Sequence, residues 1–543
     1  MNKILFFFFA SLFSFVEVTA QVSPPTQPPP PPGDSLKLVN IIKADRYGNK
    51  RIDSLTSLQV LVGNVILKQD STLFYCDSAV YNDQKKIIEA FGNVHINDKD
   101  SVHTYSQYLL YHVDSKLANL RKKVKLTDGK TTLYTEELNY DMNTKIGDYS
   151  NGGRVENGES VLTSKQGIYY TDLNDIYFKK NVRLVDPKYK LETDSMIYNT
   201  KSQIATFIDK TVIIDSANRK ITTKEGWYDL RGRRAHLAKR PVIVDGGVHI
   251  TADSIETDDS TGVNILIGRA VYKDSVQGTV VMSNYMRANR EEGEFLATQH
   301  PLMIIKQDED SIFVTADTLF SGKLSRLPGY KDSTVKGDTI KKVVTIDANK
   351  KQDDSTDRYF RAWHNVRIFS DSLQAVSDSM FWSGKDSVFQ LFTQPIVWAS
   401  DNQITGDTIY LFTKNKKPDR LFVFENGLMI NKAGEAMYNQ IRGNRINGYF
   451  VDGDINYIRA RGNAESIYYV KDDAGYLVGV NKAAGDIIDM RFENKELKKV
   501  VFISEVKGSM YPVRQLTEEE KTLRGFQWFD KKRPKSKFEL FGD

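Results

Sequence analysis

The residues that could perform chemistry are few, and none of them forms a known catalytic or metal-binding pattern. The seven histidines contain no His-Glu-x-x-His pair of the kind that binds zinc from a helix. Asp308-Glu309-Asp310 is acidic, but its spacing matches no calcium-binding loop. Most other carboxylates fall at turn signals, where polarity alone explains them. We therefore expect no catalytic residue, no metal site and no cofactor, and a binding or structural role instead of an enzyme.

Cysteine content and net charge exclude a disulfide within the chain and give no indication of nucleic-acid binding. Cys76 is the only cysteine, so no disulfide can form within the chain, and we interpret Cys76 as a small apolar residue of a strand. The chain has 75 Lys and Arg against 70 Asp and Glu, a formal net charge of +5 with the two signs interspersed. This balance is too mild to indicate nucleic acid as a partner.

A short motif around a valine recurs along the first half of the sequence. The valines are residues 65, 94, 124, 155, 182, 212, 242 and 271, so the steps between them are 29, 30, 31, 27, 30, 30 and 29 residues. The best examples read Gly63-Asn64-Val65, Gly92-Asn93-Val94 and Lys180-Asn181-Val182. A constant period of this length indicates a repeat architecture.

A second motif has the same period and completes the unit. It reads Asp77-Ser78-Ala79-Val80-Tyr81 and Asp194-Ser195-Met196-Ile197-Tyr198, and Asn or Asp turn residues follow most of its tyrosines. Each unit is therefore predicted to be strand, tight turn, strand and short connection. Apolar and polar residues alternate along the valine strand, which indicates one buried and one solvated face. We expect the valine face to point inward and leave the facing of the tyrosines open.

The ends of the chain and its middle are different in composition. Residues 1–20 have a basic start, an apolar core and a small-residue cleavage site, and they predict a cleaved signal peptide. Residues 21–36 form a proline-rich leader. The first repeat array is predicted over 37–321, a polar insertion or joint over 322–357 with a strand near Val343-Val344-Thr345-Ile346, and a second, looser array over 358–510.

Residues 511–543 are predicted to form a C-terminal cap with a short helix. Thr517-Glu518-Glu519-Glu520 reads as a capping box that starts this helix, which would end near Gly525. Phe526, Trp528 and Phe529 precede the basic run Lys531-Lys532-Arg533. These aromatic residues could contact a membrane or a partner, but a cap that packs them over the last strands is favoured, because a terminal repeat must cover its core.

The export signal, the period and the two motifs together resemble the OstA-like family. This is the family of the periplasmic bridge protein of lipopolysaccharide transport and of the periplasmic domain of its outer-membrane translocon. The resemblance implies an all-β fold in which repeated antiparallel strand pairs stack into an elongated V-shaped β-jelly roll, here in two arrays. It also implies a periplasmic protein, or one peripheral at the outer membrane, that carries the acyl chains of lipopolysaccharide or a related glycolipid in an apolar groove.

Partners and contact residues follow from the same resemblance. Neighbouring OstA-like jelly rolls would add edge to edge, and a separate outer-membrane translocon barrel would be a further partner. The groove-facing, lipid-binding candidates rest on the alternation together with the resemblance, and are Val65, Leu67, Val94, Ile96, Val124, Leu126, Val182, Leu184, Val212, Ile214, Val242 and Val244.

Two other interpretations remain open at this point. The first is an exported β-solenoid, a structural or adhesin-like scaffold whose closed core is filled by its own side chains; parallel strands and a dry interior would favour it. The second is an enzyme of envelope polysaccharide on a right-handed β-helix, which would need carboxylates clustered on one solvated face. The sequence does not show that cluster.

Overall fold

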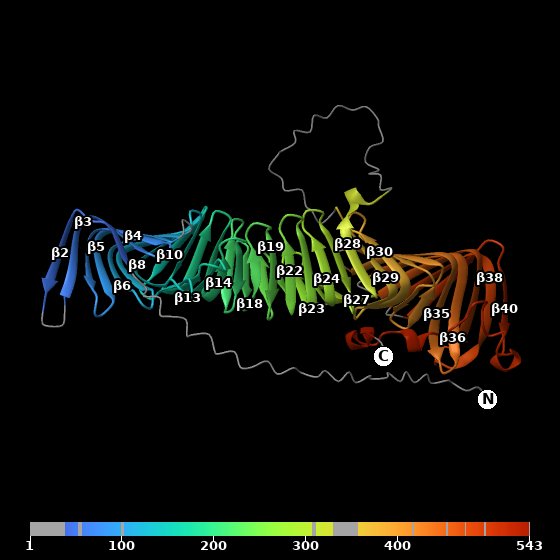
Figure 1. The fold of residues 1–543 in the computed structure, drawn as a ribbon. Helices are drawn as coiled ribbons and strands as arrows, with labels where there is room; N and C mark the ends of the chain where they lie inside the picture. The colour runs from blue at the N-terminus through green and yellow to red at the C-terminus, as the bar shows by residue number, and fades with distance from the viewer. Residues whose placement is uncertain are drawn as a thin grey trace, which may run out of the picture.

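The computed structural model describes residues 39–52, 57–98, 102–306, 311–328, 357–414, 417–451, 454–472, 474–493 and 496–541. In these residues the chain forms forty β-strands and four short 3-10 helices, and the strands join into one continuous sheet. All the pairings between strands are antiparallel, from β1 at one end to β40 at the other (Figure 1). The predicted all-β fold of stacked antiparallel strands is confirmed. The predicted signal peptide and proline-rich leader lie outside the described residues.

The first half of the sheet contains twenty-two strands in chain order. They are β1 (Asn40–Lys43), β2 (Arg46–Arg51), β3 (Ser57–Gln69), β4 (Thr72–Asn82), β5 (Ile87–Asp98), β6 (Val102–His112), β7 (Leu117–Thr127), β8 (Thr131–Asp141), β9 (Ile146–Tyr149), β10 (Gly153–Asn157), β11 (Ser160–Ser164), β12 (Gln166–Tyr170), β13 (Asp175–Asp186), β14 (Tyr189–Asn199), β15 (Ile204–Phe207), β16 (Thr211–Asp215), β17 (Lys220–Thr223), β18 (Glu225–Asp229), β19 (Arg234–Ala238), β20 (Val242–Asp245), β21 (Val248–Thr251) and β22 (Ser254–Asp258).

The second half contains the remaining strands and the 3-10 helices. They are β23 (Val263–Asp274), β24 (Thr279–Asn289), β25 (Glu294–Thr298), β26 (Leu302–Lys306), β27 (Ser311–Thr315), β28 (Thr318–Lys323), η1 (Leu324–Arg326), β29 (Arg358–Phe369), β30 (Leu373–Ser383), β31 (Val388–Phe392), β32 (Ile396–Ala399), β33 (Asn402–Thr405), β34 (Thr408–Lys414), β35 (Lys417–Gly434), β36 (Met437–Val451), β37 (Asp454–Lys471), β38 (Leu477–Glu493), β39 (Glu496–Ile503), β40 (Lys507–Tyr511), η2 (Val513–Gln515), η3 (Asp530–Lys532) and η4 (Lys537–Phe541).

A two-residue corner bends the long strands, and the recurring valine motif marks this corner. In β5 the corner residues Gly92 and Asn93 have φ angles of 70° and 43°, a left-handed conformation that Gly and Asn tolerate best. The strand register shifts between Phe91 and Val94 because Gly92 and Asn93 have no partner in the ladder. Each corner turns the strand from one half of the sheet into the other.

The second sequence motif supplies the partner of the corner. Asp77, which opens that motif, accepts a hydrogen bond of 3.0 Å from the side-chain amide of Asn93, and Asp45 accepts one of 2.8 Å from Asn64. Asn426 and Asp407 repeat the arrangement at 3.1 Å far along the chain. In these units the two motifs share one period because the Asp at one corner holds the corner of a neighbouring strand.

We expect Asn93→Ala to lower the free energy of unfolding by about 1 kcal/mol, because it removes this hydrogen bond and an Asn from a left-handed position. Asn93→Gly should recover the backbone part alone. Urea unfolding would measure both. If the Asp77–Asn93 contact is the cause, the double variant Asn93→Ala/Asp77→Ala should be no less stable than the sum of its two single variants predicts. An Asn93→Ala protein as stable as the wild type would contradict the role of the corner.

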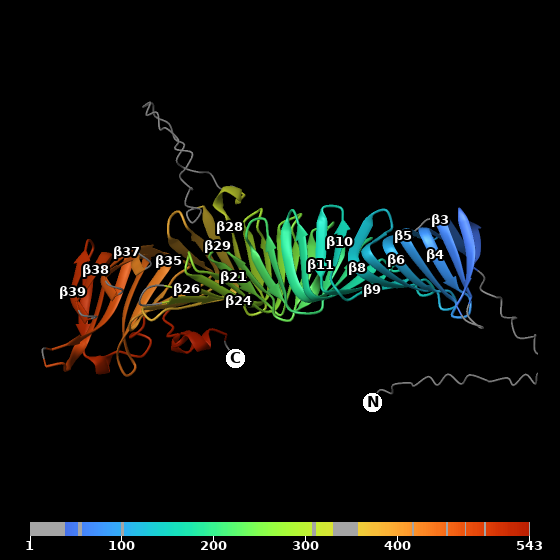
Figure 2. The same ribbon diagram turned by 90° about the vertical axis from the view of Figure 1, so that its left-hand side faces the viewer.

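The repeats continue across the predicted joint. β29 pairs with both β27 and β28, so the sheet runs on without interruption from the first group of repeats into the second (Figures 1 and 2). Residues 329–356, which include the strand predicted near Val343, lie outside the described residues. No helix in the described part of the chain is long and apolar enough to cross a membrane.

The C-terminal segment, residues 512–541, forms a strap that runs back across the outer face of the second half of the sheet. Side chains of the sheet bond the strap backbone: Lys482 donates to the carbonyl of Glu520. Gln440 bonds the carbonyl of Lys521 and the amide of Leu523, and Gln403 bonds the carbonyl of Gln527 and the amide of Phe529. Gln374 accepts a hydrogen bond from the Arg533 guanidinium. The three glutamines are buried, with exposed fractions of 2%, 0% and 5% for Gln440, Gln403 and Gln374.

The expected short helix in this segment is absent, which corrects the prediction. The capping-box bonds do form, since Thr517 N–H donates to Glu520 and Glu520 N–H donates to the Thr517 hydroxyl. The chain then makes only a single turn, because the Gln440 side chain of the sheet donates to the carbonyl of Lys521 and accepts from the amide of Leu523. Phe526 and Trp528 pack on Tyr438, at ring distances of 5.3 Å each, as the cap interpretation expected.

Candidate functional site

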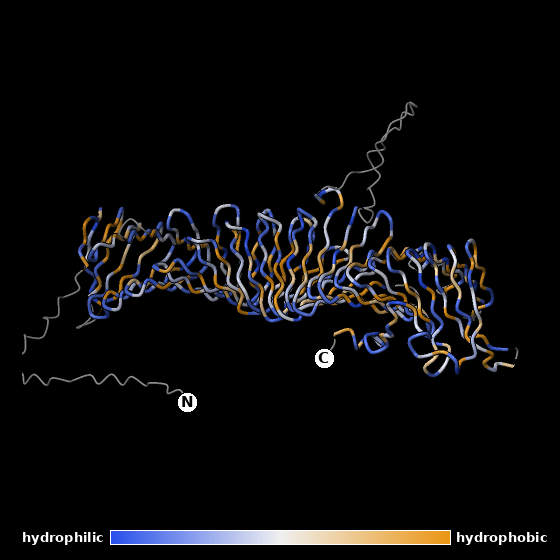
Figure 3. Tube along the Cα trace, turned by 90° about the vertical axis from the view of Figure 1, so that its right-hand side faces the viewer, coloured by the Kyte–Doolittle hydropathy of each residue, from blue (hydrophilic) through white to orange (hydrophobic). Residues whose placement is uncertain are grey.

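The two halves of the sheet enclose a long apolar interior. Buried aliphatic and aromatic side chains from Leu61 to Phe492 belong to one contiguous cluster. Figure 3 shows apolar and polar residues alternating along the strands throughout the length of the molecule. The alternation follows from the strand period of two, which sends every second side chain inward.

Eight of the twelve predicted inward residues lie in this interior, and none of them is more than 2% exposed. They are Val65, Leu67, Val94, Ile96, Val124, Leu126, Val182 and Leu184. Their contact with a lipid stays a prediction, because the structure shows only their packing against the protein's own side chains.

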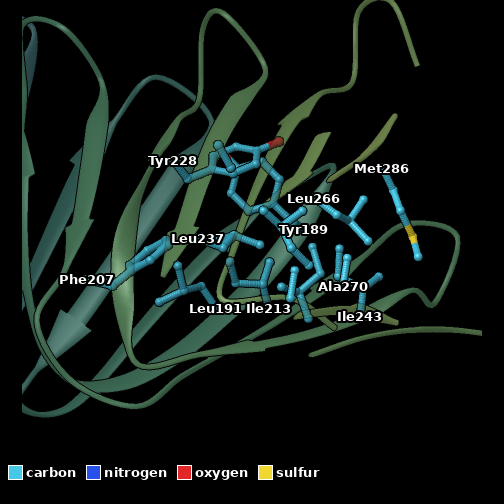
Figure 4. Close-up of a cluster of buried hydrophobic side chains, with 14 of the residues drawn as sticks. Tyr189, Leu191, Phe207, Ile213, Tyr228, Leu237, Ile243, Leu266, Ala270 and Met286 are labelled. Atoms are coloured by element: carbon cyan, nitrogen blue, oxygen red, sulfur yellow. The ribbon is translucent and has the colours of Figure 1, made fainter. Parts of the chain in front are cut away.

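The other four residues face outward, so their predicted inward placement is wrong. Ile214 and Val242 are 41% and 37% exposed, and Val212 and Val244 are half-buried. In their strands the inward positions belong to Ile213 and Ile243, each 3% exposed, which lie within the interior cluster of Figure 4.

The cause is the position of the corner relative to valine. The inward residue is the one that directly follows the corner, whatever its type: Val94 after Asn93, but Thr211 after Lys210 and Pro241 after Arg240. Counting valines therefore shifts these two strands by one residue, and a shift of one residue exchanges the two faces of a strand.

The tyrosines of the second motif, whose facing the sequence left open, point into the interior. Tyr111, Tyr140, Tyr169 and Tyr198 are at most 3% exposed and follow one another at steps of 29 residues. Burial raises the pKa of Tyr169 and Tyr198 to about 12, so their hydroxyls stay neutral at physiological pH. They give one side of an otherwise apolar interior a row of neutral hydroxyl groups.

The strand ends form two rims, and the rims meet. The first rim contains the turns between β3 and β4, β10 and β11, and β16 and β17; the second contains the turns between β6 and β7, β14 and β15, and β22 and β23. We call the line of contacts between the rims the seam. Polar side chains form it within the described residues.

Hydrogen bonds and ion pairs cross the seam at regular intervals. Near the N-terminal end, Gln69 donates to the carbonyl of Val113 at 3.0 Å and Lys116 pairs with Asp70 at 2.5 Å. Further along, Lys145 pairs with Asp98, and Asn157 donates to the carbonyl of Thr200 at 3.0 Å. Together with the ion pairs of Arg219, these contacts join the two rims and close this side of the interior from β3 to β23.

Among the seam ion pairs of the described residues, Arg219 is the most buried cation. Its guanidinium contacts Asp215 on its own rim at 2.9 Å and Asp259 on the opposite rim at 3.0 Å. The side chain of Arg219 is 9% exposed, and those of the two aspartates are 21% and 14% exposed. Burial lowers the pKa of the guanidinium, but the two carboxylates outweigh it and the net pKa is raised, so Arg219 is charged throughout the accessible pH range.

The site therefore offers enclosure without reactive groups. Within the described residues no cluster of His, Cys, Asp and Glu could hold a metal ion. Cys76 is buried, and burial raises the pKa of its thiol to about 12, which makes it a poor nucleophile. The acidic patch at residues 308–310 lies outside the described residues. The geometry suits the sequestration of an elongated apolar group.

Two family models match the N-terminal half of the chain. Residues 37–194 match a family model described as OstA-like protein. That part of the chain is therefore similar to the OstA-like family. Residues 149–241 also match a model described as lipopolysaccharide-assembly, LptC-related, so the two matches together span residues 37–241.

No curated protein gives a match. One of the similar solved structures is LptH from Pseudomonas aeruginosa, described as the LptA-homologous periplasmic component of the conserved lipopolysaccharide transport device. The two proteins are 13% identical, the match covers 26% of this chain and 95% of LptH, and the TM-score is 0.21.

Proposed function

We propose that this OstA-like protein is a bridge in lipopolysaccharide transport. It holds the acyl chains of lipopolysaccharide, or of a related glycolipid, between the two halves of its sheet and passes them toward the outer membrane. The observation that carries the proposal is the single apolar interior, which continues from β3 to β38 in a chain with two matches to lipopolysaccharide-transport families.

The chemistry of the interior fits this cargo. Burial of an acyl chain stabilises the complex by roughly 0.8 kcal/mol per CH₂ group, and the repeats supply many similar positions along one axis. Movement between equivalent positions changes the free energy little, so transport needs an external driving force and no bond is made or broken. Because the seam closes the interior, the rims must separate wherever an acyl chain lies between the halves.

The ends of the sheet fit an assembly of several jelly rolls. β1 and β2 at one end and β40 at the other are exposed throughout, and the backbone groups of an edge strand can pair with a strand of another protein. We propose that neighbouring OstA-like proteins, including the periplasmic part of a translocon, add to these edges. Export by a cleaved signal peptide and a periplasmic location belong to the same proposal.

A closed scaffold is the second candidate. The filled interior and the polar seam favour it, because a structural protein needs no opening. The antiparallel pairing of all the strands opposes the parallel solenoid that this alternative first suggested. The two candidates differ in one testable respect, which is whether lipid reaches the interior side chains.

Photo-crosslinking in living cells tests this. We expect reactive residues at Val94, Val182 and Ile243 to form adducts with lipopolysaccharide, because these side chains are at most 3% exposed and line the interior. His95 and Val242 are matched controls: each is adjacent to an interior position on the same strand and points outward. Adducts at the controls in equal yield, or no lipid adduct at any position, would favour the closed scaffold.

A further inference from the structure

A row of tyrosine hydroxyls lies on the inner side of the seam. Each of these tyrosines is the second-last residue of a strand that ends at the second rim, and each is at most 9% exposed. One further strand separates each of them from the next, so they follow one another at intervals of about 10 Å along the interior. We call these residues the hydroxyl row; they are Tyr111, Tyr140, Tyr169, Tyr198 and Tyr228.

Polar side chains of the first rim bond members of this row. Tyr111 donates a hydrogen bond to Oε1 of Gln69, the last residue of β3. Tyr198 accepts a bond of 3.2 Å from the side-chain amide of Asn157, the last residue of β10. Both bonds cross from one rim to the other. Separation of the rims therefore breaks them and leaves two hydroxyls in apolar surroundings without these partners.

Tyr189 adds a further hydroxyl to the same region. It begins β14 at the first rim and is 7% exposed, and within the described part of the chain its hydroxyl makes no hydrogen bond. Its ring lies 5.1 Å from that of Tyr228, in the interior that Figure 4 shows. Burial, followed by the charge of Asp186, raises the pKa of Tyr189, so the hydroxyl is neutral and can donate. A buried hydroxyl without a partner is unfavourable, and a ligand that accepts a hydrogen bond would satisfy it.

We propose that the hydroxyl row and Tyr189 bind the carbonyl groups through which the acyl chains of the cargo are joined to its sugar. This inference rests on the proposed function. An acyl chain begins at a carbonyl carbon. A cargo with its hydrocarbon in the interior and its sugar outside the seam therefore places its ester or amide carbonyls at the depth of the row. Tyrosine suits this boundary, because its ring belongs to the apolar interior and its hydroxyl can donate to a carbonyl oxygen.

The cargo would replace the hydrogen bonds that its entry breaks. When the rims separate, the hydroxyls of Tyr111 and Tyr198 lose their partners on the first rim, and ligand carbonyls take the place of these partners. Without such donors, a carbonyl moved from water into the interior would be an uncompensated polar group. Because the row has the period of the repeat, a cargo that advances by one repeat, about 10 Å, meets the same donors again. The row would thus set the length of one transport step.

Isothermal titration of the full chain with two synthetic glycolipids tests the proposal. One probe carries medium-length acyl chains on a sugar through ester bonds. The other carries alkyl chains of the same length on the same sugar through ether bonds, and so lacks the carbonyls. We expect the wild type to bind the ester at least ~10-fold more tightly, because each hydrogen bond contributes about fivefold and more than one forms. Equal affinity for both probes would overturn this inference and leave the binding of acyl chains intact.

Replacing every tyrosine of the hydroxyl row by phenylalanine removes the hydroxyls and keeps the rings. This variant should bind the ether probe as the wild type does and should lose its preference for the ester, since a buried carbonyl without a donor is unfavourable. Tyr134→Phe is the matched control. Tyr134 lies on the same strand as Tyr140 but faces outward and is 38% exposed, so the preference should remain. An ester preference that persists in the row variant would assign the hydroxyls to the structure alone.

Thermal melts of the ligand-free proteins give a second readout. Tyr189→Phe should melt no lower than the wild type, because its hydroxyl has no hydrogen bond to lose within the described residues. Tyr198→Phe should melt lower, since Asn157 then keeps only its bond to Thr200. A lower melting temperature for Tyr189→Phe would contradict its part in the site. Failure of both probes to bind, together with the absence of lipid adducts at Val94, would overturn the proposed function and this inference with it.

Discussion

A chain that ends after Tyr511 should lose on the order of 5 kcal/mol of stability in its last repeats and should aggregate. The residues under the strap form one row across the strands, in which Gln374, Trp398, Gln403, Ile430 and Gln440 are successive cross-strand neighbours. Trp398 and Ile430 are fully buried, although they lie on the outer face of the sheet. Burial of each large apolar side chain is worth about 1.5–3 kcal/mol, so uncovering several of them removes a large part of the local stability.

Thermal unfolding by circular dichroism and hydrogen exchange over β32 and β33 would measure this loss. Phe538→Ala is the control, because Phe538 lies in the strap but is 82% exposed, and it should leave both measurements unchanged. Gln403→Ala should give a smaller loss of about 1–3 kcal/mol, since it leaves the carbonyl of Gln527 and the amide of Phe529 without their side-chain partner. Normal exchange protection in the truncated chain would show that the strap is dispensable.

The strap also shows where sequence reasoning stops. The bulky aromatic residues Phe526 and Trp528 indicated a cap, because exposed rings need a surface to cover. The glutamines that hold it could not be recognised, since Gln403 and Gln440 lie in strands where an outward polar residue is ordinary. Their role depends on a contact between residues 124 positions apart, Gln403 and Gln527, which no local pattern encodes.

The repeat itself was readable because one physical requirement recurs. Most corners of the valine strands contain residues in a left-handed conformation, followed by an inward residue, and Gly-Asn-Val satisfies this in the clearest units. Where Lys239 and Arg240 occupy the corner, the requirement is met by less typical residues and Pro241 takes the inward position. The spacing of the repeat is unchanged at this corner, but Val242 faces outward instead of inward.

The seam could not be predicted from the sequence, for a different reason. Asp and Lys at turns are expected from solvation alone, so Asp70 and Lys116 carried no signal of their own. Their contact arises only because two halves of a bent sheet bring turns 46 residues apart into register. The sequence thus predicted the apolar interior, whereas the device that closes it is a property of the folded chain.

Replacing Arg219 should show how much its ion pairs across the seam contribute to the free energy of unfolding. We expect Arg219→Met to lower the free energy of unfolding by about 3 kcal/mol, because it keeps much of the side-chain volume but leaves Asp215 and Asp259 as partly buried carboxylates without their shared cation. Arg219→Lys should recover only part of this, since an ammonium cannot bridge both carboxylates as the planar guanidinium does. Urea unfolding gives both values.

Arg183→Met is the matched control for this measurement. Arg183 also pairs with a carboxylate, that of Glu192 at 2.7 Å, but the two side chains are 63% and 62% exposed. An exposed pair contributes little, so this variant should lose less than about 1 kcal/mol. If Arg219→Met costs no more than Arg183→Met, the rims are not held by their ion pairs, and entry of an acyl chain between them would meet little resistance. If it costs the expected amount, lipid entry requires a local opening that the cargo, a partner or the transport machinery must drive.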